Sequence, residues 1–408
     1  MIGTHGMTQP ADLSDVRMTN LAVVLRYVRT HAPCSRADIA ASTGLNKATV
    51  SSLVADLLER RLLRETGMAE NRIGRPAAML TLESRPYAAI GLEVATDHLA
   101  VVAVDLTGER LLTWRRAYPG LDGTPGRAEA AVAALAGRVV AKMAAQDRRV
   151  LGLTVGVPGQ VGADGGVRFA PHLGRPDLEL HAALERGLRR PDYEVVVDSA
   201  ANLAALAEHR AGADADTPDL VTLVGDAGVS AGIITGGRLL RGGRGSAGQV
   251  GHLQVDCDGP LCRCGRTGCL EAVAGLPALV RRALPDTEDD GPVTDYAPEL
   301  ERIVALAKAG DTRVTEVLAD TGRLLGRGVS TLAELLDPQV VVLGGTFATL
   351  APWLLPAVEA EVKSRAAAPG DLGFRVTVST LHPDAAAVGG AMLALDRLEA
   401  GRLPVPVE

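Results

Sequence analysis

Residues 252–272 read HLQVDCDGPLCRCGRTGCLEA, and three of the chain's five cysteines fall between Cys262 and Cys269. His252 lies ten residues before the first of these three cysteines. Thiolates and an imidazole at this spacing are typical of a tetrahedral Zn²⁺ site. We therefore expect a zinc ion bound by His252, Cys262, Cys264 and Cys269. A closed set of four ligands leaves no position for a reactive water, so this zinc would be structural.

The other two cysteines, Cys34 and Cys257, have no such spacing, and we expect them to be packing or surface thiols. The chain has no run of 18 apolar residues, and its first 15 residues lack the pattern of a secretory signal. We therefore expect a cytoplasmic protein that does not contact a membrane. In a reducing compartment a cysteine cluster indicates a metal site or catalysis before a disulfide. The alternative for this cluster is a set of free thiols buried near one another.

The composition limits the class of protein. A chain of 408 residues is too long for one hydrophobic core, so two or three domains are expected. Aromatic residues make up 2%, which argues against a single-strand nucleic-acid binder that stacks bases on aromatic side chains. The net charge is −7, yet residues 1–90 hold 11 Lys and Arg against 8 Asp and Glu. The N-terminal part is therefore mildly basic and the remainder acidic.

The N-terminal pattern predicts a disordered arm over residues 1–16 and a winged helix-turn-helix over residues 17–84. TNLAVVLRYVRTH spaces its apolar residues as one helix face. Ser35 and Asn46 are placed as N-caps of two further helices, which a short turn at Gly44 separates. A hairpin follows, with MAENRIGRP as its loop, and this order of elements is that of a winged helix-turn-helix.

The second of these capped helices has an apolar stripe on one side and small or polar residues on the other. That combination suits a recognition helix in the major groove of double-stranded DNA. A preceding arginine is placed for a backbone phosphate, and the basic loop RIGRP suits a minor groove. The DNA contacts that we expect are made by Arg36, Asn46, Lys47, Thr49, Ser51, Ser52, Arg72 and Arg75. The alternative is a three-helix packing module whose hairpin serves dimerisation.

From about residue 86 strands alternate with helices, and many of the strands open on Gly-rich turns. YAAIGLEV, VLGLTVGVPG, YEVVVDS, LVTLVGDAG and QVVVLGGT read as strands, and a last helix is expected to start near Ala385. This alternation predicts an α/β architecture after the N-terminal domain.

These motifs carry a family resemblance. GQVGHLQVDCDGPLCRCGRTGCLEAVAG resembles the hallmark of the ROK family (repressors, open reading frames, kinases), in which Glu-x-Gly-His precedes Cys-x-Cys-Gly-x-x-Gly-Cys-x-Glu. GVPGQV, APHLGRPDL, GGRLLRGGRGSAG and LDPQVVVLGG are also similar, and the N-terminal segment resembles the DNA-binding arm of the repressor branch. The resemblance implies a two-lobed, actin- or hexokinase-like (ribonuclease H-like) domain with a sugar cleft. Its first lobe would comprise 85–200 with 385–408, and its second lobe 201–384.

The sugar site that the resemblance implies is altered in this chain. Family kinases have Glu where Gln249 stands, and Asn in a Pro-Asn-Leu stretch where His172 stands. Their Asn-Asp-x-Asn run, which includes the catalytic Asp, aligns with Ser199 and Ala200. Asp198 takes the base position only if the alignment slips by two. The effector contacts that we expect are His172, Asp198, Ser199, Gln249, His252 and Glu271.

The phosphate-binding loops of the family kinases are changed as well. Asp-x-Gly-Gly-Thr appears as EVATD at 93–97, and Gly-Thr-Gly-x-Gly appears as DAGVS at 226–230. Asp226 would repel a phosphate, and Ala200 cannot accept a proton from a sugar hydroxyl. The resemblance therefore implies a regulator that is not an enzyme, in which a kinase-derived domain binds a carbohydrate or related metabolite.

The partners that we expect are a pseudo-palindromic DNA operator and a second copy of the chain, as a homodimer or homotetramer, because one short helix reads too few bases alone. One alternative is a ROK sugar kinase with an N-terminal extension. The other is a regulator that responds to a partner protein only.

Overall fold

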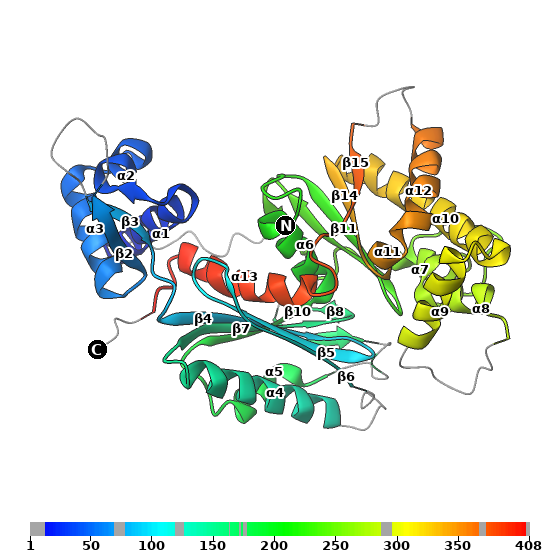
Figure 1. Cartoon of the computed structure of the whole chain (residues 1–408), viewed down its shortest axis with the longest axis horizontal. Coiled ribbons are helices and arrows are strands. Elements are labelled where there is room, and N and C mark those ends of the chain that lie inside the picture. The colour runs from blue at the N-terminus through cyan, green and yellow to red at the C-terminus, as the bar shows by residue number, and fades with distance from the viewer. Residues whose placement is uncertain are drawn as a thin grey trace.

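The structure is a computed structural model that describes residues 13–68, 78–118, 126–162, 164–170, 173, 178–286, 296–366 and 373–404. Figure 1 shows an N-terminal domain of helices and a small sheet beside two α/β lobes. Each lobe is built on a five-stranded sheet, so the mixed α/β class predicted from the sequence is confirmed. No helix in the described ranges combines the length and apolar character needed to span a membrane.

The N-terminal domain is the predicted winged helix-turn-helix. Its helices are α1 (Leu13–His31), α2 (Arg36–Thr43) and α3 (Lys47–Glu59). Its strands are β1 (Cys34–Ser35), β2 (Leu63–Met68) and β3 (Ala78–Leu82), in the order β1-β3-β2 with antiparallel pairing. Helix α1 begins at Leu13, so the disordered arm predicted over residues 1–16 is wrong for its last four residues. The N-terminus of the arm lies outside the described residues.

Side-chain caps explain where the two central helices begin. The Ser35 hydroxyl accepts a hydrogen bond from Asp38 N, and the Asp38 carboxylate accepts one from Ser35 N, which forms a capping box. Asn46 Oδ1 accepts a hydrogen bond of 2.8 Å from Thr49 N at the start of α3. Gly44, at a φ of 73°, ends α2 in the left-handed region. Ser35, Gly44 and Asn46 are the residues at which the sequence predicted these helix ends.

The first lobe has a mixed sheet in the order β10-β7-β4-β5-β6. Figure 1 shows α4 and α5 on one face of this sheet and α13 on the other. The strands are β4 (Tyr87–Val94), β5 (His98–Val104), β6 (Arg110–Ala117), β7 (Arg149–Val157) and β10 (Glu194–Ser199). The helices are α4 (Arg127–Ala144), α5 (Leu180–Gly187) and α13 (Ala385–Glu399), and a hairpin is formed by β8 (Gln160–Val161) and β9 (Val167–Phe169).

The second lobe has a sheet in the order β13-β12-β11-β14-β15 and a group of helices on its outer side. The strands are β11 (Leu220–Gly225), β12 (Val229–Thr235), β13 (Arg238–Leu239), β14 (Val340–Gly345) and β15 (Arg375–Val378). The helices are α7 (Leu270–Ala274), α8 (Leu276–Ala283), α9 (Ala297–Lys308), α10 (Thr312–Leu336), α11 (Thr346–Thr349) and α12 (Ala351–Arg365), with a short 3-10 helix, η2 (Val250–His252).

Helix α6 (Ala200–Ala211) lies between the two sheets, packed against α13 of the first lobe and against β11 and β12 of the second. Two glycines make this close packing possible. A Cβ atom on Gly389 of α13 would lie 1.7 Å from Leu203 O, and one on Gly232 of β12 would lie 2.1 Å from Ala201 O. The backbone of α6 therefore touches both lobes directly, because no side chain intervenes.

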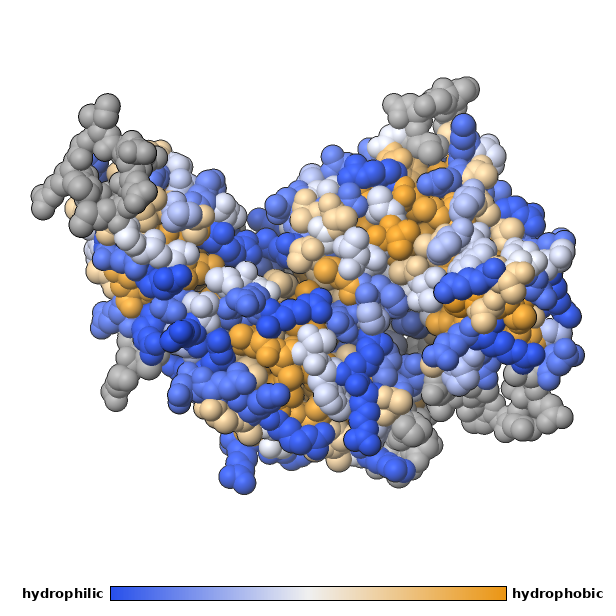
Figure 2. All heavy atoms as spheres, in the orientation of Figure 1, coloured by the Kyte–Doolittle hydropathy of each residue, from blue (hydrophilic) through white to orange (hydrophobic). Residues whose placement is uncertain are grey.

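Helix α13 also contacts the N-terminal domain through its C-terminal end. Glu399 forms salt bridges with Arg26, at 3.3 Å, and with Arg29, at 2.6 Å, both of which lie on α1. Arg60 Nη1 donates a hydrogen bond of 2.5 Å to Pro404 O. The outline in Figure 2 is notched between the N-terminal domain and the second lobe, so this domain is attached on the side of the first lobe. Helix α13 thus contacts both α1 of the N-terminal domain and α6 between the lobes.

Candidate functional site

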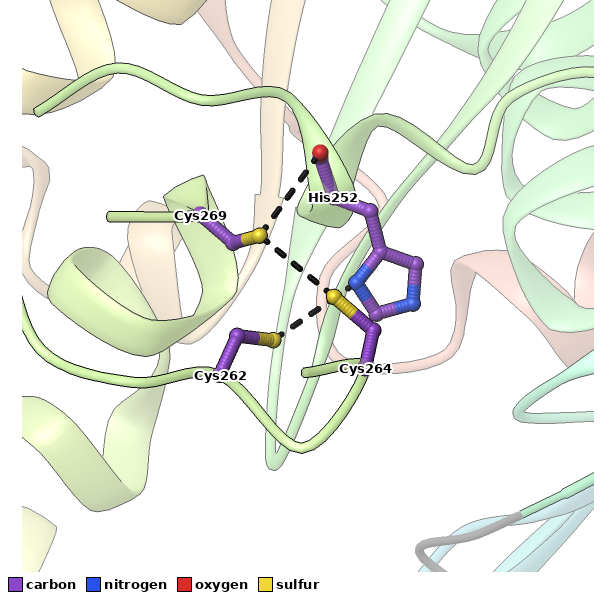
Figure 3. A group of neighbouring side chains, drawn as sticks. All are labelled: His252, Cys262, Cys264 and Cys269. Atoms are coloured by element: carbon purple, nitrogen blue, oxygen red, sulfur yellow. Dashed lines mark hydrogen bonds between the residues drawn. The ribbon is translucent and has the colours of Figure 1, made fainter. Parts of the chain in front are cut away.

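The His and Cys residues predicted to bind a metal lie together. His252 ends η2, Cys262 and Cys264 lie in the following loop, and Cys269 precedes α7. One ligand atom from each lies within 4.8 Å of the others (Figure 3). Cys262 Sγ is 3.7 Å from His252 Nδ1, and Cys264 Sγ is 3.6 Å from Cys269 Sγ. A tetrahedral zinc with Zn–S bonds of about 2.3 Å requires sulfur separations of roughly 3.8 Å, so this cluster could hold such an ion.

Backbone contacts hold the cluster loop in a tight shape. Cys262 N donates to Arg266 O at 2.7 Å, and Gly265 N donates back to Cys262 O at 2.9 Å. Gly268 has a φ of 66°, and a Cβ atom there would lie 1.4 Å from Asp256 O. The backbone N–H and side chain of Arg266 lower the pKa of Cys264 to about 6, whereas burial and the neighbouring thiols raise the pKa of Cys269. Without an ion, Cys264 is therefore the thiol of this pair that ionises first.

The two remaining cysteines take no part in this cluster. Cys34 is buried, and burial, followed by the charge of Asp38, raises its pKa to about 11. Cys257 is exposed. Their positions agree with the expectation that these two residues are packing or surface thiols.

A cleft of about 100 Å³ lies where the two lobes meet. The first lobe contributes the end of β4 and the residues that directly follow β7, the second contributes the end of β11 and the start of β12, and the start of α6 lies between them. The carboxyl ends of parallel strands are the usual ligand-binding edge of an α/β sheet. The polar and charged lining residues are Glu93, Thr96, Asp226, Ser230, Gln249, His252, Arg263, Cys264 and Glu271.

Three of the predicted effector residues line this cleft, namely Gln249, His252 and Glu271. Glu271 Oε2 accepts a hydrogen bond of 3.3 Å from Val229 N, so its carboxylate is fixed against the start of β12. His252 also belongs to the cluster with Cys262, Cys264 and Cys269, so this cluster forms part of the cleft wall.

Asp198 and Ser199 do not line the cleft, and here the structure differs from the prediction. The side chain of Asp198 is 2% exposed, and its carboxylate accepts hydrogen bonds from Asn202 Nδ2 at 2.9 Å and Ser199 N at 2.7 Å. It also pairs with Arg241 at 2.5 Å. The residue thus has a structural network of its own. The third prediction in this group, His172, lies outside the described residues.

Three charged cleft residues, Glu93, Arg263 and Asp226, were not among the predicted effector contacts, although Asp226 was expected to repel a phosphate. Glu93 is the last residue but one of the otherwise apolar strand YAAIGLEV, and a charge in that place was the available signal. Arg263 lies between Cys262 and Cys264, and no motif in the sequence singles it out. Ala200, which the family resemblance predicts at the position of the kinases' base, lines the cleft at the start of α6.

The carboxyl group of Asp226 is a much weaker acid than an ordinary aspartate. Its side chain is accessible to water inside the cleft, but the cleft walls surround it. Burial by these walls, and then the negative charges of Glu93 and Asp97, raise the pKa of Asp226 from 3.8 to about 7. Burial raises the pKa of Glu93 also.

This raised pKa predicts a pH-dependent stability. The folded chain keeps the Asp226 proton up to about pH 7, whereas the unfolded chain loses it near 3.8. The group's stabilising contribution is therefore lost as the pH rises between these values. We expect Asp226→Asn to raise the melting temperature more at pH 8 than at pH 5, relative to the parent protein. Asp286→Asn, at an exposed position, is the control. Equal shifts at both pH values would contradict the raised pKa.

The predicted recognition helix has the expected two faces. Val50, Leu53, Val54 and Leu57 are buried in the N-terminal domain. On the other side the exposed residues include Asn46, Lys47, Ser51 and Ser52, and Thr49 is half-buried.

Arg36 and Ser52 have intramolecular partners. Arg36 Nη2 pairs with Glu65 at 2.9 Å, and the Ser52 hydroxyl accepts a hydrogen bond of 3.4 Å from Arg17. Arg17, on α1, also pairs with Asp56 of α3 and was not among the predicted contacts, because α1 reads only as a packing helix. The predicted wing residues Arg72 and Arg75 lie outside the described residues.

Comparison with known proteins identifies the family. A model of the ROK family matches residues 89–397. The chain belongs to the ROK family. A MarR family model matches residues 22–70, within the N-terminal domain. The DNA-binding transcriptional dual regulator NagC of Escherichia coli K12 is 30% identical, over 88% of this ROK protein and 88% of its own length. The xylose repressor of Bacillus subtilis is 27% identical, over 95% and 97%.

Solved structures separate two kinds of ROK relative. A ROK family transcriptional regulator, a homologue of the E. coli MLC protein, has a TM-score of 0.79 at 25% identity and covers 95% of this chain and 98% of its own. A ROK family glucokinase from Streptomyces griseus, in complex with glucose and AMPPNP, has a TM-score of 0.63 at 29% identity. That kinase match covers 76% of this chain and 99% of the kinase. The regulator therefore matches a larger share of this chain than the kinase does.

Proposed function

We propose that this ROK protein is a DNA-binding transcriptional regulator, acting as a repressor, whose DNA affinity is controlled by a small molecule in the cleft. The observation that carries the proposal is the combination of two parts in one chain. A winged helix-turn-helix presents the polar face of α3, and it is packed onto a ROK domain through α13. Relatives that are named as regulators resemble the chain over most of its length.

In this proposal α3 enters the major groove, with Asn46, Lys47, Thr49, Ser51 and Ser52 facing the DNA. Small residues on that face, such as Ala48 and Ala55, let the helix approach the base edges. Arg36 would exchange its exposed pair with Glu65 for a phosphate, because such surface pairs contribute little. Arg72 and Arg75 would contact the minor groove. Two chains, as a homodimer or within a homotetramer, would read a pseudo-palindromic operator.

The cysteine cluster would hold a structural Zn²⁺ through His252, Cys262, Cys264 and Cys269. The spacing of the thiol and imidazole atoms supports this assignment, since four soft or borderline ligands converge at tetrahedral distances. A bound ion would cross-link the four residues and would carry no reactive water. The cluster leads directly into α7, which contains Glu271, so the ion would also hold His252 and Glu271 in place at the cleft wall.

The cleft would bind the effector, a carbohydrate or related metabolite, through Gln249, His252 and Glu271. We expect no catalysis, because Ala200 stands at the position of the base. A change in the angle between the lobes would reach the N-terminal domain through α6 and α13, whose backbones are in direct contact. Glu399, with its two salt bridges to α1, lies at the end of that path.

Lys47 provides the test of the DNA-binding surface. We expect Lys47→Ala to weaken binding to the operator by roughly tenfold, because a lost phosphate or base contact costs about 1–3 kcal/mol. If the lost contact is to a phosphate, the dependence of affinity on salt should decrease by about one counterion. The affinity would be measured by fluorescence anisotropy on operator DNA over a range of salt concentrations.

Lys308→Ala is the matched control, since it removes the same charge from an exposed position on α9 in the second lobe. It should bind DNA as the parent does. Equal affinities for both variants would show that α3 does not read the DNA.

A further inference from the structure

A second cavity, of about 60 Å³, adjoins the effector cleft. The two cavities share four lining residues, including the carboxylates Glu93 and Asp226. Glu93 comes from the end of β4 in the first lobe, and Asp226 follows β11 in the second. The two side chains therefore face a common space from opposite lobes.

The cations near these two carboxylates have other partners. His98 Nδ1 pairs with Asp97 at 2.6 Å, and Arg115 donates to Pro383 O at 2.5 Å and approaches Asp384 at 3.8 Å. The other charged or titratable side chains in the two linings are Arg263, Cys264, Glu271, His252 and His382. Burial lowers the pKa of His382, so this imidazole carries little charge at neutral pH. Within the described ranges, Glu93 and Asp226 form no salt bridge.

Buried polar atoms of this second cavity also lack partners. Thr222 is 1% exposed, and its Oγ1 has no hydrogen-bond partner in the described part of the chain. The same holds for Glu93 Oε2 and His98 Nε2. A buried polar atom without a partner is costly, and native proteins satisfy nearly all of them. Three such atoms in one cavity indicate a polar ligand.

The arrangement favours an organic cation over a metal ion. Among the described residues, the cysteine cluster is the group of three or more His, Cys, Asp or Glu side chains that could hold a metal ion, and Glu93 and Asp226 do not belong to such a group. The second cavity therefore lacks the set of converging oxygen ligands that Ca²⁺ requires. A primary ammonium group has three N–H donors and reaches separated acceptors such as two carboxylates and a hydroxyl.

We propose that the effector is a small hydroxylated primary amine, such as an amino sugar or an amino alcohol, whose ammonium group lies between Glu93 and Asp226. Its hydroxyl groups would face Gln249, His252 and Glu271 in the same cleft. This inference rests on the proposed role of the cleft as the effector site. Thr222 Oγ1 would accept one of the ammonium hydrogens.

The protonation of the two carboxyl groups should make the affinity for the amine depend on pH. Burial raises the pKa values of both Glu93 and Asp226, and the negative charge of Glu93 contributes to raising that of Asp226 to about 7. A bound ammonium stabilises the ionised forms, so its binding releases protons and weakens as the pH falls. Titration of Asp226 alone predicts a fall in affinity of roughly eightfold between pH 7.5 and pH 6.

The test compares amines with matched neutral compounds on the full-length, zinc-loaded protein. Isothermal titration and thermal shift at pH 7.5 would use glucosamine against glucose, and 2-amino-1,3-propanediol against glycerol. We expect at least one amine to bind tenfold or more tightly than its neutral partner. Glu93→Gln and Asp226→Asn should each reduce its affinity by tenfold or more, and Asp226→Asn should flatten the pH dependence. Glu334→Gln, at an exposed position on α10, should leave the affinity unchanged.

Several results would overturn the inference. These are binding of neither amine, equal binding of amine and neutral partner, or an amine affinity that survives both substitutions. Stabilisation by Mg²⁺ or Ca²⁺ alone, without an effect of the amines, would also overturn it in favour of a metal site. DNA binding by the same preparation is measured separately. A protein that binds its operator but not the amines therefore retains the proposed function and loses only this inference.

Discussion

Cys264→Ser is expected to remove the bound zinc and to unfold or loosen the second lobe. The cluster ties η2 to the start of α7, and the buried residues Leu270 and Val273 of α7 belong to the core of that lobe. A structural zinc supplies on the order of 10 kcal/mol or more of apparent binding free energy. Loss of one ligand should therefore lower the melting temperature by far more than the loss of an exposed thiol. The measurement is elemental analysis of the purified protein together with calorimetry.

Cys257→Ser is the matched control for this substitution. Cys257 and Cys264 are both exposed, and both lie in the same loop region, but only Cys264 belongs to the cluster. We expect one zinc per chain in the parent and in Cys257→Ser, and none tightly held in Cys264→Ser. Freshly purified parent protein without stoichiometric zinc would contradict the zinc assignment. So would equal melting temperatures for the two serine variants.

The second large effect is the absence of phosphoryl transfer. The reaction requires a base on the attacking hydroxyl, a cradle for the phosphates and in-line positioning. Ala200 offers no base, whose loss typically costs roughly 10²–10⁴-fold. Glu93, near the end of β4, and Asp226, directly after β11, place carboxyl groups where the phosphates of ATP would have to approach. We therefore expect neither ATP binding nor phosphorylation of hexoses above background, in calorimetry and in a coupled ADP assay.

Restoring the base alone should not restore the reaction. In Ala200→Asp the two loops still carry their carboxylates, so we expect this variant to remain inactive. ATP-dependent turnover of a hexose by the parent protein would instead favour the sugar-kinase interpretation. If Asp198→Asn then abolished that turnover, Asp198 would be the base. Its present contacts with Asn202 and Arg241 indicate a structural role.

The sequence predicted those features that depend on residues close together in the chain. The caps at Ser35 and Asn46 act over three residues, so the beginnings of α2 and α3 were readable from the sequence. The four residues of the cysteine cluster lie within one short stretch of the chain, so their spacing was enough to predict that they lie together. The family hallmark then implied the two-lobed fold, which the ROK match agrees with.

Features that depend on distant contacts were not readable in the same way. Asp198 follows an apolar run and looked available for a ligand, but it pairs with Arg241, which lies in the loop after β13 of the other lobe. The proximity of Glu93 and Asp226 needs both sheets to be placed before it can be seen. The same holds for Glu399, whose partners on α1 lie at the opposite end of the sequence. No local pattern encodes such pairs.

The most direct test of DNA-binding regulation is selection from a random double-stranded DNA library by the purified full-length protein. We expect enrichment of one pseudo-palindromic sequence, with its half-sites about one helical turn or a multiple of it apart, because two copies of α3 would read adjacent major grooves. Lys47→Ala should enrich it poorly, and Lys308→Ala should enrich it as the parent does. Failure of the parent protein to enrich any sequence above the input library, at low salt and with zinc bound, would contradict the proposed function.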